Sequence, residues 1–203
     1  MVGRLQKKTK LVYGVGINDA DYPVHPKIDG KAVRCPYYTT WRNMLERCYS
    51  QKSLEYRPSY KGCSVCPDWI YFMNFRAWMM KQDWEGKELD KDLLVRGNKV
   101  YSPETCMFIN RGVNIFLVEK ESARGDYMLG VYYEKSRGKF RACCSNPFTG
   151  KMDKIGRFNT EKEAHEAWRQ YKHKLACILA DLQTDARVAN ALRSRYAESF
   201  LIG

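Results

Sequence analysis

Residues 89–116 read LDKDLLVRGNKVYSPETCMFINRGVNIF and hold the densest set of structural signals in the chain. They begin with two aspartates around a lysine, Asp90-Lys91-Asp92, and a short β-type run follows at 93–95. The tripeptide Arg96-Gly97-Asn98 indicates a turn, because glycine and asparagine tolerate the left-handed backbone of tight turns. This half of the segment therefore predicts a strand that ends in a turn.

The second half of the segment carries the signals of a helix start and of another strand. Residues 102–105 are Ser-Pro-Glu-Thr. Serine can cap a helix, proline fits the first helical position, and glutamate favours the positive end of the helix dipole. An apolar run, Cys106–Ile109, comes next. The whole segment is thus expected to form a small unit of strands and a helix.

The pattern Asp-x-Asp, then a Gly/Asn turn, then Tyr-Ser-Pro-Glu-x-Cys resembles the degenerate HNH (His-Me finger) proteins of bacteriophages. In that family an Asp-His pair ends the first strand, and an asparagine lies on the short helix. This chain has Lys91 at the histidine position and Thr105 at the asparagine position. The resemblance implies a ββα core with flanking helices, and catalytic positions at Asp90, Lys91, Asp92 and Thr105.

A His-Me finger cleaves phosphodiesters with a histidine that activates water and one divalent metal. Asp90 and Asp92 offer the hard oxygen ligands that suit Mg²⁺, and on a strand residues two apart share a face. Lys91, fully protonated, is a poor base. The structural alternative is that one aspartate orients the turn and the other pairs with Arg96 or Lys99. Both interpretations stay open, so metal-dependent nicking is expected to be weak or lost.

The bulk composition favours a polyanionic partner. The 203 residues carry a formal net charge of +12, with a pI near 9.3 and a hydrophobic fraction of 44%. Such an excess points first to nucleic acid and second to an anionic membrane. No apolar run approaches the roughly 20 residues that span a bilayer, and the first ten residues lack the features of a signal peptide. We therefore expect a cytoplasmic protein, in an infected bacterial host cell if the resemblance holds.

The eight cysteines are expected to be thiols or metal ligands rather than disulfides in that compartment. Cys63 and Cys66 have the CxxC spacing of one half of a zinc knuckle. The candidates for a second pair are Cys35, Cys48 and Cys106, and they include no second CxxC. Buried thiols packed against aromatic residues are the alternative, and we expect no structural zinc.

The N-terminal part of the chain predicts two amphipathic helices packed on 89–116. One spans 37–48, and the other begins near Asp68 with an aromatic stripe that is typical of a core. A short strand is expected at 11–16. His25 lies in a loop, where a surface role and a catalytic role both remain open.

The C-terminal part of the chain has a different pattern of predicted elements. A polar segment, 118–128, is typical of a linker. Strand patterns follow at 129–133, 139–144 and 154–158, and a long helix then runs to about Leu182. His165 and His173 are expected on the surface of that helix. The tail, 184–203, predicts a closing helix.

This unit of three strands and a helix resembles the AP2-type DNA-binding domain that occurs beside HNH cores in phage proteins. The matching residues are Gly130-Val131-Tyr132, Gly138–Ala142 and Ile155–Thr160, followed by an Ala-rich helix. The resemblance implies a three-stranded antiparallel sheet, backed by the helix, whose other face meets the major groove. It divides the chain into an N-terminal core, 1–117, and a DNA-binding domain, 129–203.

Strand alternation sorts the side chains of this sheet. Val131, Phe140, Ala142 and Ile155 are expected to face the helix. The expected DNA contacts are Tyr132, Lys135, Arg137, Lys139, Arg141 and Lys154. Residues 130–180 contain eleven Lys and Arg against five Asp and Glu, a net of +6. The family's usual arginine is absent at Tyr132, so no DNA sequence preference carries over. The alternative is a solvated basic sheet that binds nothing specific.

These observations predict an α+β protein that binds double-stranded DNA and is related to phage HNH homing-type endonucleases. Mg²⁺ is the expected cofactor if the altered centre is active. The alternative function is that of a host-takeover factor, which binds a bacterial protein through the aromatic N-terminal half. The oligomeric state stays open.

Overall fold

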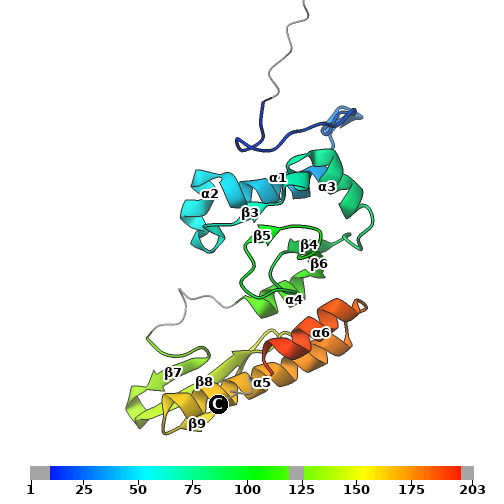
Figure 1. Ribbon diagram of the computed structural model, residues 1–203. Helices are drawn as coiled ribbons and strands as arrows, with labels where there is room; N and C mark the ends of the chain where they lie inside the picture. The colour runs from blue at the N-terminus through cyan, green and yellow to red at the C-terminus, as the bar shows by residue number, and fades with distance from the viewer. Residues whose placement is uncertain (1–9, 119–125, 198–203) are drawn as a thin grey trace, which may run out of the picture. The chain divides into compact units, whose positions relative to one another are not determined.

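The computed structural model describes residues 10–118 and 126–197 (Figure 1). The chain divides into two compact units, Met1–Phe108 and Ile109–Gly203. Both combine helices with small sheets, which confirms the predicted α+β class. The expected linker, 118–128, lies largely outside the described residues, and so does the end of the expected closing helix.

Unit 1 is built on two helices that pack through aromatic side chains. Helix α1 (Pro36–Tyr49) begins with proline, which has no N–H to leave unsatisfied there. Its buried face includes Tyr38, Trp41 and Leu45, at helical spacing. The Trp41 Nε1 donates a hydrogen bond to the Trp69 carbonyl oxygen at 2.7 Å. The prediction for 37–48 is confirmed to within one residue.

The remaining helical segments of unit 1 are short. They are α2 (Gln51–Tyr56), α3 (Phe72–Met79) and two 3₁₀ turns, η1 (Pro58–Tyr60) and η2 (Pro67–Ile70). The second predicted helix is therefore split into η2 and α3. Fully or nearly buried side chains from α1, η2 and α3, together with Tyr101 from a later strand, form one core: Trp41, Met44, Leu45, Trp69, Phe72, Phe75, Met79 and Tyr101.

The strands of unit 1 come in pairs. Strands β1 (Lys27–Ile28) and β2 (Lys31–Ala32) are antiparallel, while β3 (Ser64–Val65) and β5 (Val100–Tyr101) are parallel. Strand β4 (Lys87–Asp90) pairs with β6 (Met107–Asn110).

Three local predictions for the N-terminal part were wrong. Residues 11–16 form a tight turn, with the Val12 N–H bonded to the Gly16 carbonyl oxygen at 2.8 Å, because Tyr13 and Gly14 have left-handed backbones. Residues 93–95 are bends rather than a strand, and 102–105 form a turn rather than a helix start. The next helix is α4 (Arg111–Leu117), which is capped by Asn110.

Unit 2 contains an antiparallel sheet in the order β7-β8-β9. Its strands are β7 (Val131–Glu134), β8 (Lys139–Ser145) and β9 (Met152–Phe158), with the 3₁₀ turn η4 (Lys135–Arg137) after β7. All three predicted strands are present. The 21-residue helix α5 (Glu161–Asp181) lies along the sheet (Figure 1). The side chain of Thr160 caps α5, and the Glu163 carboxylate completes the capping box.

Helix α4 belongs to unit 2, although the sequence analysis grouped it with the N-terminal core. The Lys172 Nζ on α5 donates a hydrogen bond to the Phe116 carbonyl oxygen at 2.7 Å. The Phe116 ring lies edge-on to Tyr196, which follows α6 (Ala186–Arg195). The burial of a charged residue on α5 was not expected, and Ile178 on the same helix is 42% exposed.

Candidate functional site

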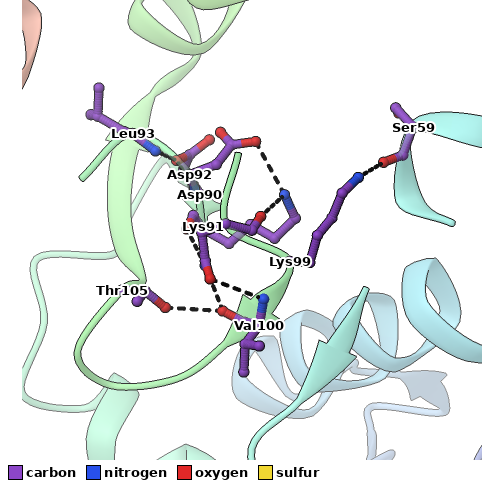
Figure 2. A network of polar contacts seen from close by, with 9 residues as sticks. Ser59, Asp90, Lys91, Asp92, Leu93, Lys99, Val100 and Thr105 are labelled. Atoms are coloured by element: carbon purple, nitrogen blue, oxygen red, sulfur yellow. Dashed lines mark hydrogen bonds and ion pairs between the residues drawn. The ribbon is translucent and has the colours of Figure 1, made fainter. Parts of the chain in front are cut away.

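Asp90 ends β4, and its carboxylate is committed to the backbone of the next turn. The Oδ1 accepts hydrogen bonds from the backbone N–H groups of Asp92 at 3.0 Å and Leu93 at 2.7 Å (Figure 2). Burial, and then the nearby charge of Asp92, raise the pKa of the Asp90 carboxyl group. Asp90 therefore orients the turn, which is the structural role that the sequence analysis gave as the alternative to metal binding for one of the two aspartates.

Lys91 is buried, and its ammonium group joins two parts of the loop. The Nζ donates to the Asp92 Oδ2 at 3.1 Å and to the Asn98 carbonyl oxygen at 2.9 Å (Figure 2). Burial, the largest single influence, opposes the charged form, but the charge and hydrogen bond of Asp92, with smaller contributions from Cys63 and Asp90, together raise the pKa of Lys91. Lys91 thus stays protonated and has no lone pair with which to activate water.

Asp92 pairs with its neighbour Lys91, a partner that the sequence analysis did not suggest. Lys99, one of the two suggested partners, donates instead from Nζ to the Ser59 carbonyl oxygen at 2.7 Å. The two aspartates were expected to share one face of a strand. That expectation was wrong, because β4 ends at Asp90 and Asp92 lies in the bend beyond it.

Asn98 is the residue of this loop whose importance the sequence analysis missed. Its Nδ2 donates to the carbonyl oxygens of Lys91 and Val100, both at 2.7 Å, and its Oδ1 accepts from the Val100 N–H at 3.1 Å. Thr105 donates from Oγ1 to the same Val100 carbonyl oxygen at 2.9 Å. Asn98 and Thr105 therefore hold the loop closed. The Gly-Asn signal indicated a turn but not these side-chain contacts.

The other candidate metal and catalytic residues of unit 1 are not gathered into one site. Within residues 10–118 and 126–197, no group of three or more His, Cys, Asp or Glu side chains has the arrangement to hold a metal ion. His25 lies with its ring edge-on to Tyr38, 5.4 Å between centroids. All eight cysteines are free thiols, and burial raises the pKa of Cys48 and Cys106 to about 12. The expectation that Cys63 and Cys66 hold no zinc stays a prediction.

The three-stranded sheet of unit 2 has one face covered by α5 and one face directed away from it. Val131 and Ala142 are buried on the covered side and pair across β7 and β8. Strand alternation and register define the outer face, which consists of Tyr132, Glu134, Lys139, Arg141, Cys143, Met152, Lys154 and Arg157. Tyr132 is 43% exposed and Met152 is 59% exposed. The outer face thus carries apolar as well as charged groups.

A register shift between Ala142 and Cys143 changes the alternation of β9, and so determines which of its residues face outward. Ala142 pairs with Gly156, whereas Cys143 pairs with Lys154, so Ile155 is an extra residue in β9. Asp153 turns toward the helix, where its Oδ2 accepts a hydrogen bond from the Tyr171 hydroxyl at 2.7 Å. Lys154 consequently stays on the outer face, as expected.

The charges of the outer face are organised around Glu134, which the sequence analysis did not single out. The Arg157 Nε lies 2.6 Å from its Oε2, and the Arg137 Nε and Arg141 Nη1 lie 3.4 and 3.8 Å from its Oε1. Lys139 donates to the Asn159 side chain. In the part of the chain that the structure describes, Lys135 and Lys154 form no ion pair. Arg157 was also missed, although the alternation of β9 places it beside Arg141.

The two histidines of α5 are half-buried and not on its open surface. The His165 Nδ1 lies 2.9 Å from the Leu129 carbonyl oxygen, and its ring stacks on Trp168. The His173 Nε2 lies 3.6 Å from the Cys177 Sγ. Both rings are therefore engaged in contacts within unit 2.

Comparisons with protein-family models, with curated proteins and with solved structures gave no match. Over the residues that the structure covers, none of the helices combines the length and the apolar character needed to cross a membrane. Inferences about function consequently depend on the exposure, charge and contacts of the residues described above.

Proposed function

We propose that this protein binds double-stranded DNA through the outer face of the β7-β8-β9 sheet. One observation carries the proposal: the face opposite α5 combines exposed cations with an exposed tyrosine and an exposed methionine. Lysine and arginine bind phosphates, arginine also reads guanine, and apolar groups contact the thymine methyl group. Tyr132 and Met152 would supply the apolar contacts on this face.

The proposed mode of binding is that of an AP2-type domain, with an altered HNH-type centre in the N-terminal part of the same chain. Two features support the altered centre. Asp90 already accepts two backbone hydrogen bonds, and the Lys91 ammonium is tied to Asp92 and Asn98. General-base catalysis typically supplies about 10²–10⁴ in rate, and Lys91 cannot supply it. Plasmid nicking with Mg²⁺ is accordingly expected to be very slow or absent.

The proposal is tested by DNA binding of the full chain over a range of salt concentrations. Lys135→Ala with Lys154→Ala removes two exposed cations that form no ion pair among the described residues, one in the turn η4 beside the outer face and one on the face itself. The matched control, Lys162→Ala with Lys174→Ala, removes two exposed lysines of α5 and changes the net charge equally. Each phosphate contact contributes about 0.9 to the slope of log affinity against log salt, so the first double variant should lose a slope of about 2.

The control double variant should keep most of the wild-type slope. Equal slopes and affinities for the two double variants would show that the outer face is not the DNA-binding surface, because binding would then depend only on the total charge of the protein. Failure of the wild-type protein to bind any duplex would reject the proposed function altogether.

A further inference from the structure

The carboxylate of Glu134 lies among three guanidinium groups at the centre of the outer face. Its side chain is only 18% exposed, and that of Arg141 is 15% exposed, whereas Arg157 and Arg137 are 40% and 61% exposed. The hydrogen bond from Arg157 is the main reason that the pKa of Glu134 is lowered. The carboxylate therefore offsets part of the positive charge at the centre of a face proposed to meet a polyanion.

The strand register fixes this cluster in place. Tyr132, Arg141 and Arg157 lie in one row across the three strands, and Glu134 lies two residues further along β7. A side chain on this diagonal is within reach of long neighbours on the same face. The carboxylate therefore holds Arg141 and Arg157 from one side, and its two oxygen atoms limit the directions in which their remaining N–H groups point.

We infer that Glu134 is a positioning residue that makes the outer face selective among DNA sequences, by directing Arg141 and Arg157 to base edges and weakening their attraction for phosphate. This inference rests on the proposed function. Phosphate oxygens and a carboxylate carry like charges, which repel at short distance. Phosphates are then bound by the unpaired cations nearer the edges, Lys135 and Lys154.

Two physical effects favour base reading by the held arginines. An arginine that is already fixed by an ion pair loses less side-chain entropy when it binds a base. An arginine that already has an anionic partner also gains less from a phosphate than a free arginine does. Guanine presents two neutral acceptors, which a fixed guanidinium group can engage in the correct orientation.

We expect that removing a carboxylate group from the binding face will strengthen binding to random DNA. Removing the carboxylate should free the arginines to bind phosphate, so affinity for random DNA should rise while discrimination between sequences falls. A glutamate that only stabilised the sheet would give the opposite result, because its loss would weaken binding to every sequence. The direction of the change thus separates positioning from a structural role.

The experiment uses the full chain and a library of random-sequence duplexes. Duplexes enriched by the wild-type protein are compared with scrambled duplexes of the same composition, for wild type, Glu134→Gln and Asp181→Asn. Asp181 pairs with Arg193, and both are helix residues of unit 2 outside the sheet, so the control removes the same charge from another arginine pair. Glu134→Asp, which keeps the charge, is a second variant.

For Glu134→Gln we expect tighter binding to scrambled duplexes and a lower ratio of affinities for enriched and scrambled duplexes. Each freed arginine that reaches a phosphate should enlarge the loss of affinity between about 50 and 200 mM salt by about threefold, from the slope of about 0.9 per contact. Asp181→Asn should leave the ratio unchanged. Glu134→Asp should preserve most of the discrimination.

Three results would overturn the inference. In the first, Glu134→Gln and Asp181→Asn have the same affinity ratio, which leaves DNA binding itself intact. In the second, Glu134→Gln binds scrambled duplexes more weakly while its thermal unfolding is unchanged. In the third, wild type binds no duplex, and the proposed function then fails as well.

Discussion

Lys91 places a buried ammonium group between the Asp92 carboxylate and the Asn98 carbonyl oxygen, in the loop after β4. The HNH-type centre proposed above would have a histidine at that position. A lysine with these two contacts closes the loop and is not a base that activates water.

Replacing Lys91 by methionine should lower the free energy of unfolding of the protein by about 2 kcal/mol, because the Asn98 carbonyl oxygen and Asp92 lose a buried donor. Chemical unfolding measures the loss. Lys99→Met is the control, since Lys99 is exposed and donates to one carbonyl oxygen, that of Ser59. A loss for Lys99→Met as large as that for Lys91→Met would contradict the structural role of Lys91.

The sequence predicted the turn after Asp90 but not the contact between Lys91 and Asp92. Two aspartates two residues apart share a face only while the strand continues, and no local signal showed that β4 ends at Asp90. The contacts of Asn98 also span several residues and depend on the closed loop. The sequence therefore predicted that this segment turns, whereas the contacts between its side chains became visible only in the tertiary structure.

The β7-β8-β9 sheet and α5 were predictable as elements. Alternation and turn residues located all three strands, and the Thr160–Glu163 capping box marks the start of α5. The register shift in β9 was not predictable, because an extra residue leaves no clear trace in a short alternating pattern. The predicted helix start at 102–105 was wrong because Ser-Pro-Glu-Thr also suits a turn, and α4 begins later with Asn110 as its cap.

Gly130 immediately precedes β7, lies against Trp168 of α5 and should not tolerate a side chain. It has φ of +76°, and a Cβ atom there would overlap the Trp168 indole. Gly130→Ala should lower the free energy of unfolding by about 3 kcal/mol or more, from left-handed strain and overpacking together. Thermal or urea unfolding checks this.

Gly150 provides the matched control, with φ of +67° and open space around its Cα. Gly150→Ala should incur only the backbone strain, about 1 kcal/mol. If the two alanine variants lost equal stability, close packing of Trp168 against Gly130 would have no energetic role.

At the scale of the whole molecule, most of the groups with raised pKa among the described residues lie in unit 1. They include Cys48 and Cys106, both at about 12, together with Lys91 and Tyr101. In unit 2 the pKa values of Cys144 and Tyr171 are raised. A group whose pKa is higher in the folded state stabilises it fully below the unfolded pKa. That stabilisation is lost as the pH rises through the folded pKa.

Unit 1 should therefore lose more stability than unit 2 between neutral pH and about pH 10, which lies above the usual cysteine pKa of about 8.5. Four of the five tryptophans, Trp41, Trp69, Trp78 and Trp84, lie in unit 1, and Trp168 lies in unit 2. Urea unfolding followed by the fluorescence of Trp168→Phe reports on unit 1 alone. The urea midpoint of unit 1 should fall more between pH 7 and pH 10 than the midpoint of unit 2, which the sheet signal in circular dichroism follows. A fall in the unit 1 midpoint that is no larger than the fall for unit 2 would contradict this prediction.

The ammonium group of Lys91 is covalently attached to the loop that it closes. Such a cation cannot be chelated, exchanged for another ion or lost on dilution. The closure of the Asp90–Thr105 loop through this group is consequently independent of dissolved divalent ions. Adding EDTA leaves this contact in place, so a chelator can separate any effect of Mg²⁺ on DNA cleavage from an effect on the shape of the loop.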